Sequence, residues 1–168
     1  MKNRLLFGFL TVGLLMVPGA VTANEAPSPY LEVATHYEAI RLVLLSDSVE
    51  GVEDHAKAIE DLARELLEDF DAASSSVPDE DTATFKAALE EIQSASSELL
   101  ATGGLAAARE HFFALTKPMA RYRKLSGDQT SIVAYCSMAQ KAWIQPEGEI
   151  GNPYMGQKMP KCGEVVGG

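Results

Sequence analysis

Apolar residues between Ser28 and Leu125 recur at alternating spacings of three and four positions, which is the period of an amphipathic helix rather than of a strand. Four such segments follow one another, and short links join them. Helices joined by short links pack as antiparallel neighbours. The pattern therefore predicts an all-α fold in which residues 28–125 form an antiparallel four-helix bundle. The predicted core positions are Tyr30, Val33, Tyr37, Ile40, Leu44, Val52, Ala56, Ile59, Ala63, Leu66, Phe70, Phe85, Leu89, Ile92, Ser96, Leu99, Leu105, Ala108, Phe112, Leu115, Met119 and Tyr122.

Local signals mark where these helices begin and end. Ser28 followed by Pro29 is a start signal, because a serine hydroxyl caps free backbone N–H groups and proline suits the first helical position. Gly103 and Gly104 end the third helix. All of the predicted core positions lie in the helical part, so a chain truncated after Leu125 is expected to remain mostly helical.

The first 23 residues have the layout of a secretory signal peptide. Lys2 and Arg4 precede an apolar run over residues 5–17, and Val21 and Ala23 stand at the small-residue positions of a cleavage site. The apolar run is too short to span a membrane, which takes about 20 residues. We therefore expect residues 1–23 to be removed and the protein to be exported, to the periplasm, without membrane insertion after cleavage.

After that cleavage, residues 24–168 have the usual size of a single domain. The formal net charge of the whole chain is -10, and loss of two basic residues with the signal peptide makes it -12. Such an acidic surface repels nucleic-acid phosphates and anionic lipid head groups, and it favours cations or basic partners. We expect no nucleic-acid partner.

Sequence motifs of enzymes are missing from the chain. It has no glycine-rich phosphate loop, no His-Glu-x-x-His, no Gly-x-Ser-x-Gly, and none of the Glu-x-x-His pairs of a di-iron bundle. His36, His55 and His111 each precede a core position by one residue. Such positions can face each other across two helices, so a histidine cluster is conceivable, but half-exposed side chains, each with a hydrogen-bonded nitrogen, are the favoured interpretation. The sequence therefore predicts a binding protein without catalytic residues.

Residues 126–168 carry all of the cysteine in the chain and lack the helical period. The stretch "IVAYC" is predicted to be a short extended segment. Residues 126–168 as a whole are predicted to form an irregular carboxy-terminal appendage. Thiolate and thioether groups are soft ligands that suit Cu(I) or Ag(I) far better than calcium or magnesium. Such groups gather in two clusters: Cys136 with Met138, and Met155 with Met159 and Cys162.

The same residues allow a structural interpretation. In an oxidising compartment, Cys136 and Cys162 are able to form a disulfide. Closing that loop stabilises a fold by about 3 to 4 kcal/mol on the chain-entropy estimate. The methionines and Trp143 would then be the apolar filling beneath the disulfide. The residue pattern does not separate this interpretation from a metal site.

Three features of the tail, "YCSMA", Trp143 and "NPYMGQKMPKCG", follow one another in that order. They resemble the Tyr-Cys-Pro-Met-Ala segment, the tryptophan and the Asn-Pro-Tyr-x-Gly-x-x-Met-x-x-Cys-Gly segment of a periplasmic domain of unknown function. That domain is found alone and fused to heavy-metal efflux adaptor proteins of the copper and silver exporter type. The helical part of the chain resembles the same family more loosely.

The resemblance implies handling of copper or a related soft metal, with a heavy-metal efflux component as a partner. It leaves Cys136, Met138, Met159 and Cys162 as the ligand set. Ser137 departs from the family, which usually has proline there, and this loosens the turn that orients the ligands.

The sequence thus predicts an exported protein that binds Cu(I) or Ag(I) in copper homeostasis or efflux. Met155 stands at a variable position of the family motif, so it receives no ligand role from the resemblance. The alternative is a non-metal interaction module whose Cys136–Cys162 disulfide pins the tail against the bundle.

Overall fold

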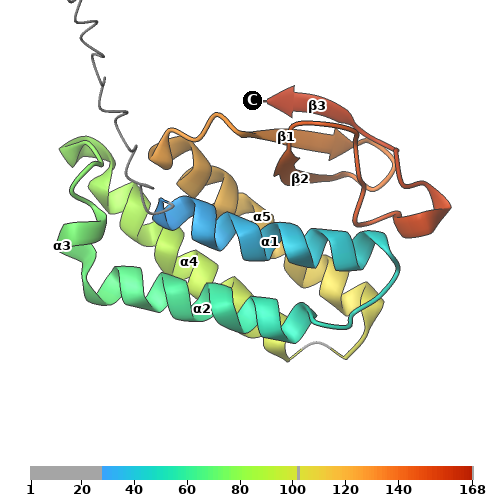
Figure 1. Cartoon of the computed structure of the whole chain (residues 1–168), viewed down its shortest axis with the longest axis horizontal. Coiled ribbons are helices and arrows are strands. Elements are labelled where there is room, and N and C mark those ends of the chain that lie inside the picture. The colour runs from blue at the N-terminus through green and yellow to red at the C-terminus, as the bar shows by residue number, and fades with distance from the viewer. Residues whose placement is uncertain (1–27, 102, 168) are drawn as a thin grey trace, which may run out of the picture.

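The computed structural model describes residues 28–101 and 103–167 (Figure 1). The predicted signal peptide lies outside these residues. Four long helices come first, and three short strands follow them in the chain. The elements are α1 (Pro29–Leu45), α2 (Val52–Glu68), α3 (Phe70–Ala73), η1 (Asp79–Asp81), α4 (Thr82–Leu100), α5 (Leu105–Ser126), β1 (Ser131–Cys136), β2 (Lys141–Pro146), η2 (Gly156–Lys158) and β3 (Glu164–Gly167).

The four long helices correspond to the four segments of helical spacing. Successive long helices run antiparallel, and α1 packs against α2, α2 against α4, α4 against α5 and α5 against α1. The predicted core positions are buried, except for Leu66, Phe70 and Leu105, which are half-buried. The Ser28 hydroxyl accepts a hydrogen bond from the Leu31 N–H at 3.3 Å, as the capping signal predicts. The apolar spacing therefore located these helices and most of their buried side chains.

The prediction of an all-α fold is wrong, because the residues after α5 form a sheet. The three strands are antiparallel and lie in the order β2-β1-β3. Ala134 of β1 pairs with Trp143 of β2, and Tyr135 pairs with Glu164 of β3. The protein therefore combines a helical bundle with a small sheet, and the tail is not an irregular appendage.

Two of the strands lack the pattern by which a strand is recognised. The central strand β1 is the segment that was expected to be extended. Strand β2 buries three successive residues, Trp143, Ile144 and Gln145, whereas most of β3 is exposed. Neither strand alternates between buried and exposed positions, so the period of two that reveals a half-buried strand is missing.

The sheet completes the core of the bundle. Ala134, Cys136, Trp143 and Ile144 belong to the same buried cluster as the helical core positions. Strand β2 contacts α5, and the Ile144 N–H donates a hydrogen bond at 3.3 Å to the Tyr37 hydroxyl of α1. The core positions therefore extend beyond the helices. The expectation that a chain truncated after Leu125 stays helical assumed that the whole core lies in the helices, and this assumption does not hold.

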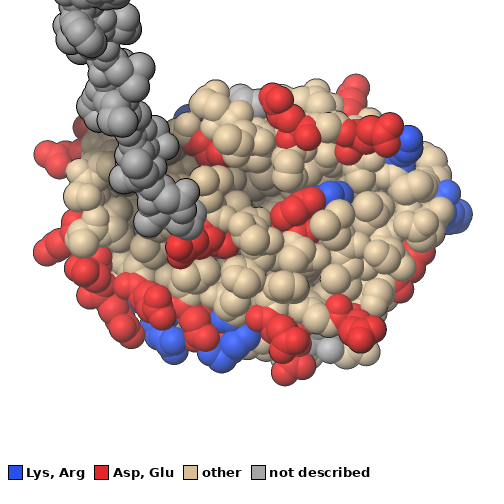
Figure 2. All heavy atoms as spheres, in the orientation of Figure 1, with Lys and Arg blue, Asp and Glu red and all other residues tan. Residues whose placement is uncertain are grey.

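Acidic side chains are frequent on the surface, and many follow the edge formed by α2 (Figure 2). Lys57 and Arg64 lie among them, and both form ion pairs with Asp61. Glu65 and Glu68 are exposed, as expected for residues off the apolar stripe. Among the described residues, we find no helix with the length and apolar character needed to cross a membrane.

Candidate metal centre

The two cysteines meet at one end of the sheet. Cys136 ends β1, and Cys162 lies just before β3. Because β1 and β3 are antiparallel and Tyr135 pairs with Glu164, the end of β1 lies beside the approach to β3. The two Sγ atoms lie 2.7 Å apart. Cys136 is buried and Cys162 is half-buried, so the pair opens toward solvent on the side of Cys162.

The two thiols differ in acidity. Burial opposes ionisation of Cys136, but hydrogen bonds from the Cys162 thiol and from the N–H groups of Ala139 and Met138 outweigh it, so the pKa of Cys136 is lowered. The hydrogen bond with Cys136 raises the pKa of Cys162, and burial adds to the effect. The first proton therefore leaves Cys136. Its thiolate is the form that binds soft metals and attacks disulfides.

Each cysteine shares a turn with a methionine. Met138 lies in the turn between β1 and β2, where the Ala139 N–H donates to Cys136 Sγ at 3.4 Å. The Cys162 N–H donates to the Met159 carbonyl at 3.1 Å, so these two residues close one turn. The Met138 side chain is 63% exposed, and Met159 is half-buried. The structure thus brings the two cysteines together and places a methionine in each adjoining turn.

Asn152 holds the loop that carries Cys162. It is fully buried, and its Nδ2 donates to the Cys162 carbonyl at 2.6 Å. Its Oδ1 accepts from the N–H groups of Tyr154 and Met155 at 2.8 and 3.0 Å, and its own N–H donates to the Pro160 carbonyl at 2.7 Å. A buried polar side chain with all of these partners fixes one loop conformation. The sequence motif contains Asn152 but does not reveal its bond to Cys162.

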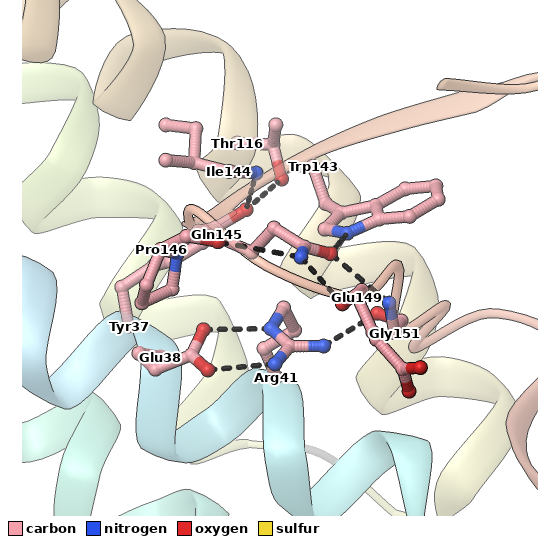
Figure 3. A network of polar contacts seen from close by, with 10 residues as sticks. All are labelled: Tyr37, Glu38, Arg41, Thr116, Trp143, Ile144, Gln145, Pro146, Glu149 and Gly151. Atoms are coloured by element: carbon pink, nitrogen blue, oxygen red, sulfur yellow. Dashed lines mark hydrogen bonds and ion pairs between the residues drawn. The ribbon is translucent and has the colours of Figure 1, made fainter. Parts of the chain in front are cut away.

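A buried polar network fixes the start of this loop to α1 (Figure 3). The Arg41 guanidinium donates to both carboxylate oxygens of Glu38 at 2.6 Å and to the Gly151 carbonyl at 2.5 Å. From the other side, Gln145 Oε1 accepts from the Gly151 N–H at 3.1 Å and from Trp143 Nε1 at 2.8 Å. Both backbone groups of Gly151 are therefore held. The loop is anchored to a helix and a strand before it reaches the cysteine.

A glycine directly after the second cysteine permits a close approach to the buried tryptophan. Gly163 has a φ of 151°, and a Cβ built on it would lie 2.6 Å from Cη2 of Trp143. A side chain does not fit there without displacing the ring. The Cys-Gly pair of the motif therefore has a structural reason, because the chain must pass directly over Trp143 for Cys162 to reach Cys136.

The separation of the two Sγ atoms lies between that of a disulfide and that of two thiolates bound to one ion. A disulfide has an S–S length of about 2.05 Å, so from 2.7 Å the sulfurs would approach by about 0.7 Å. Two thiolates on one tetrahedral ion, with metal–sulfur bonds of about 2.3 Å, lie about 3.7 Å apart, so metal binding separates them by about 1 Å. Thiols beside thioethers form a donor set that fits a soft cation.

In the described part of the chain, no three His, Cys, Asp or Glu side chains form a group suited to a metal ion. Met138 and Met159 lie in the turns that adjoin the cysteine pair, and their ligand role stays what the sequence motif implies.

All three histidines are half-buried and have a partnered ring nitrogen, as the favoured interpretation expects, and two of them are each other's partner. His36 of α1 and His55 of α2 face each other with their Nδ1 atoms 3.0 Å apart. His111 lies beside Glu98, with 3.3 Å between its Nδ1 and the carboxylate. The sequence placed all three on helix flanks, but which flanks meet depends on how the helices cross.

Comparison of the chain with protein-family models, with curated proteins and with solved structures finds no match. The resemblance of the tail to the periplasmic metal-efflux domain therefore stays an expectation based on its motifs. Any functional conclusion rests on the chemistry and geometry of the residues themselves.

Proposed function

We propose that this protein is exported and binds a soft metal ion, Cu(I) or Ag(I), in copper homeostasis or efflux. Cys136 and Cys162 are the thiolate ligands, and Met138 and Met159 add thioether ligands from the adjoining turns. The observation that carries the proposal is the meeting of the two cysteine sulfurs at 2.7 Å. The role is binding without catalysis, and a heavy-metal efflux component is the partner that receives or delivers the ion.

The acidity and exposure of the sulfur groups support this proposal. Metal ligands must lose their protons, and the lowered pKa of Cys136 makes its thiolate available nearer to neutral pH. The exposed Met138 side chain and the half-buried Cys162 offer an incoming ion a path from solvent. The acidic surface attracts cations in general. Soft donors then select among them.

A competition titration tests the proposal. The reduced protein is titrated with Cu(I) against a chromophoric Cu(I) chelator under anaerobic conditions. We expect one ion per chain, and we expect Cys136→Ser and Cys162→Ser each to abolish tight binding. Met138→Leu and Met159→Leu are each expected to weaken binding by about tenfold, which corresponds to about 1.4 kcal/mol.

Met155→Leu is the matched control for the methionine variants. Met155 lies in the same loop and packs against the core, but it has no assigned ligand role. Its replacement should leave the Cu(I) affinity unchanged. If the reduced wild type binds Cu(I) no more tightly than the double cysteine variant, the sulfur site is excluded.

The second candidate is a non-metal interaction module in which a Cys136–Cys162 disulfide pins the tail to the bundle. It is favoured by the sulfur separation of 2.7 Å, which is smaller than that of two thiolates on one ion. Thiol counting on the exported protein separates the two candidates. Free thiols favour metal binding, whereas a complete disulfide together with no Cu(I) binding after reduction favours the module.

A further inference from the structure

The histidine pair between α1 and α2 brings two imidazole nitrogens within reach of a single ion. The Nδ1 atoms of His36 and His55 lie 3.0 Å apart, and both side chains are half-buried. The ring centroids lie 5.3 Å apart, so the two nitrogens point at each other, as in a hydrogen bond. Metal–imidazole bonds are about 2.1 Å long, so both rings must turn for their nitrogens to bind one ion, and at the present separation the angle at that ion is about 90°. Neighbouring ligands have this angle in the tetragonal coordination that Cu(II) and Ni(II) prefer.

The surroundings of the pair favour a divalent cation. His36, but not His55, lines a surface hollow of about 420 Å³ between α1 and α2, together with the carboxylate residues Glu32, Asp61 and Glu65. Glu32 lies one helical turn before His36. Asp61 already pairs with basic side chains of its own helix. The hollow is open to solvent, so water is available for the coordination positions that the imidazoles do not fill.

We propose that His36 and His55 form a second, independent metal site that binds a divalent ion of borderline softness, with Cu(II) bound most tightly. The two Nδ1 atoms are the protein ligands, and water completes the coordination. The Irving–Williams order places Cu(II) above Zn(II) and Ni(II) for such a nitrogen site. The site differs in chemistry from the sulfur pair, since imidazole suits the oxidised ion and thiolate suits Cu(I).

The proton between the two rings does not prevent binding. In the free protein one Nδ1–H donates to the lone pair of the other Nδ1, so one ring carries its proton on Nδ1 and the other on Nε2. When an ion binds both Nδ1 atoms, the donor ring takes its proton on Nε2 instead. Both rings stay neutral and no proton is released. The site therefore exchanges one hydrogen bond for two metal–nitrogen bonds.

The test uses Cu(II) alone as the probe. The protein is untagged and oxidised, and a thiol assay confirms that no free thiols remain. Serine replacement of both cysteines gives a second background without thiol ligands. We expect one Cu(II) per chain and an electron paramagnetic resonance spectrum with nitrogen hyperfine structure. His36→Gln and His55→Gln should each weaken binding at least tenfold, as expected when one of two protein ligands is lost. His111→Gln is the matched control and should bind like the parent.

Two results would overturn this site: Cu(II) affinity unchanged in the His36→Gln/His55→Gln double variant, or a spectrum without nitrogen ligands. Circular dichroism confirms that each variant is folded. The outcome is separable from that of the sulfur site, because the same double variant should retain the Cu(I) affinity of the reduced wild type. Loss of Cu(I) affinity in that variant would show that the two sites are not independent.

Discussion

Replacement of Asn152 by alanine tests whether this residue positions the second cysteine. Its side chain donates one hydrogen bond, to the Cys162 carbonyl, and accepts two, from the N–H groups of Tyr154 and Met155. Each such bond contributes about 1 kcal/mol net, so the variant should lose about 3 kcal/mol of unfolding free energy. For a chain of this size, that lowers the Tm by about 6 to 12 °C.

Urea denaturation followed by circular dichroism measures the loss, and the alkylation rate of Cys162 in the reduced protein reports its position. We expect faster alkylation, because the carbonyl of Cys162 is no longer held. Gln157→Ala is the control, since this exposed side chain makes one bond, to the Leu45 carbonyl, and should cost about 0.5 kcal/mol. An Asn152→Ala variant that resembles Gln157→Ala in both stability and alkylation would refute the positioning role.

Three further outcomes follow from the fold. Truncation after Leu125 should abolish cooperative thermal unfolding, because it removes Trp143 and its neighbours from the core, and a sharp transition in the truncated chain would contradict this. Gly163→Ala should destabilise the protein by about 1 to 3 kcal/mol through overpacking against the Trp143 ring, and tryptophan fluorescence should shift. Burial, followed by the nearby His55, lowers the pKa of His36 below 6.5 despite Glu32. His36 therefore binds a proton more readily in the unfolded chain than in the folded one. Its effect is that the free energy of unfolding is highest above about pH 6.5 and declines below it. His36→Gln should make this decline smaller when the Tm is measured over a series of pH values. An identical pH profile for the variant and the wild type would exclude His36 as the cause.

The sequence predicted the helices because each one repeats the same signal over several turns. Val33, Ile40 and Leu44 occupy one stripe of α1, and every one of them is fully buried. Strand β3 offers no comparable signal, since Val165 and Val166 are both exposed. Its pairing with β1 is a contact between distant parts of the chain, which local periodicity does not record.

The candidate site was predictable in composition but not in geometry. The cysteines and methionines stand out by their chemistry and short spacing. The contact of Cys136 with Cys162 depends on β1 and β3 being antiparallel neighbours. The His36–His55 pair depends likewise on the crossing of α1 and α2, and flank positions on a helix do not reveal which neighbour they meet.

The order of the elements along the chain has a consequence for when the sulfur site exists. All four long helices precede the strands, so they leave the ribosome first. Cys136 gains its partner only when β3 docks beside β1, after the residues on both sides of Cys162 have been synthesised. A nascent or partly folded chain therefore does not hold its two thiols side by side, so tight binding of one ion by both of them requires the folded tail.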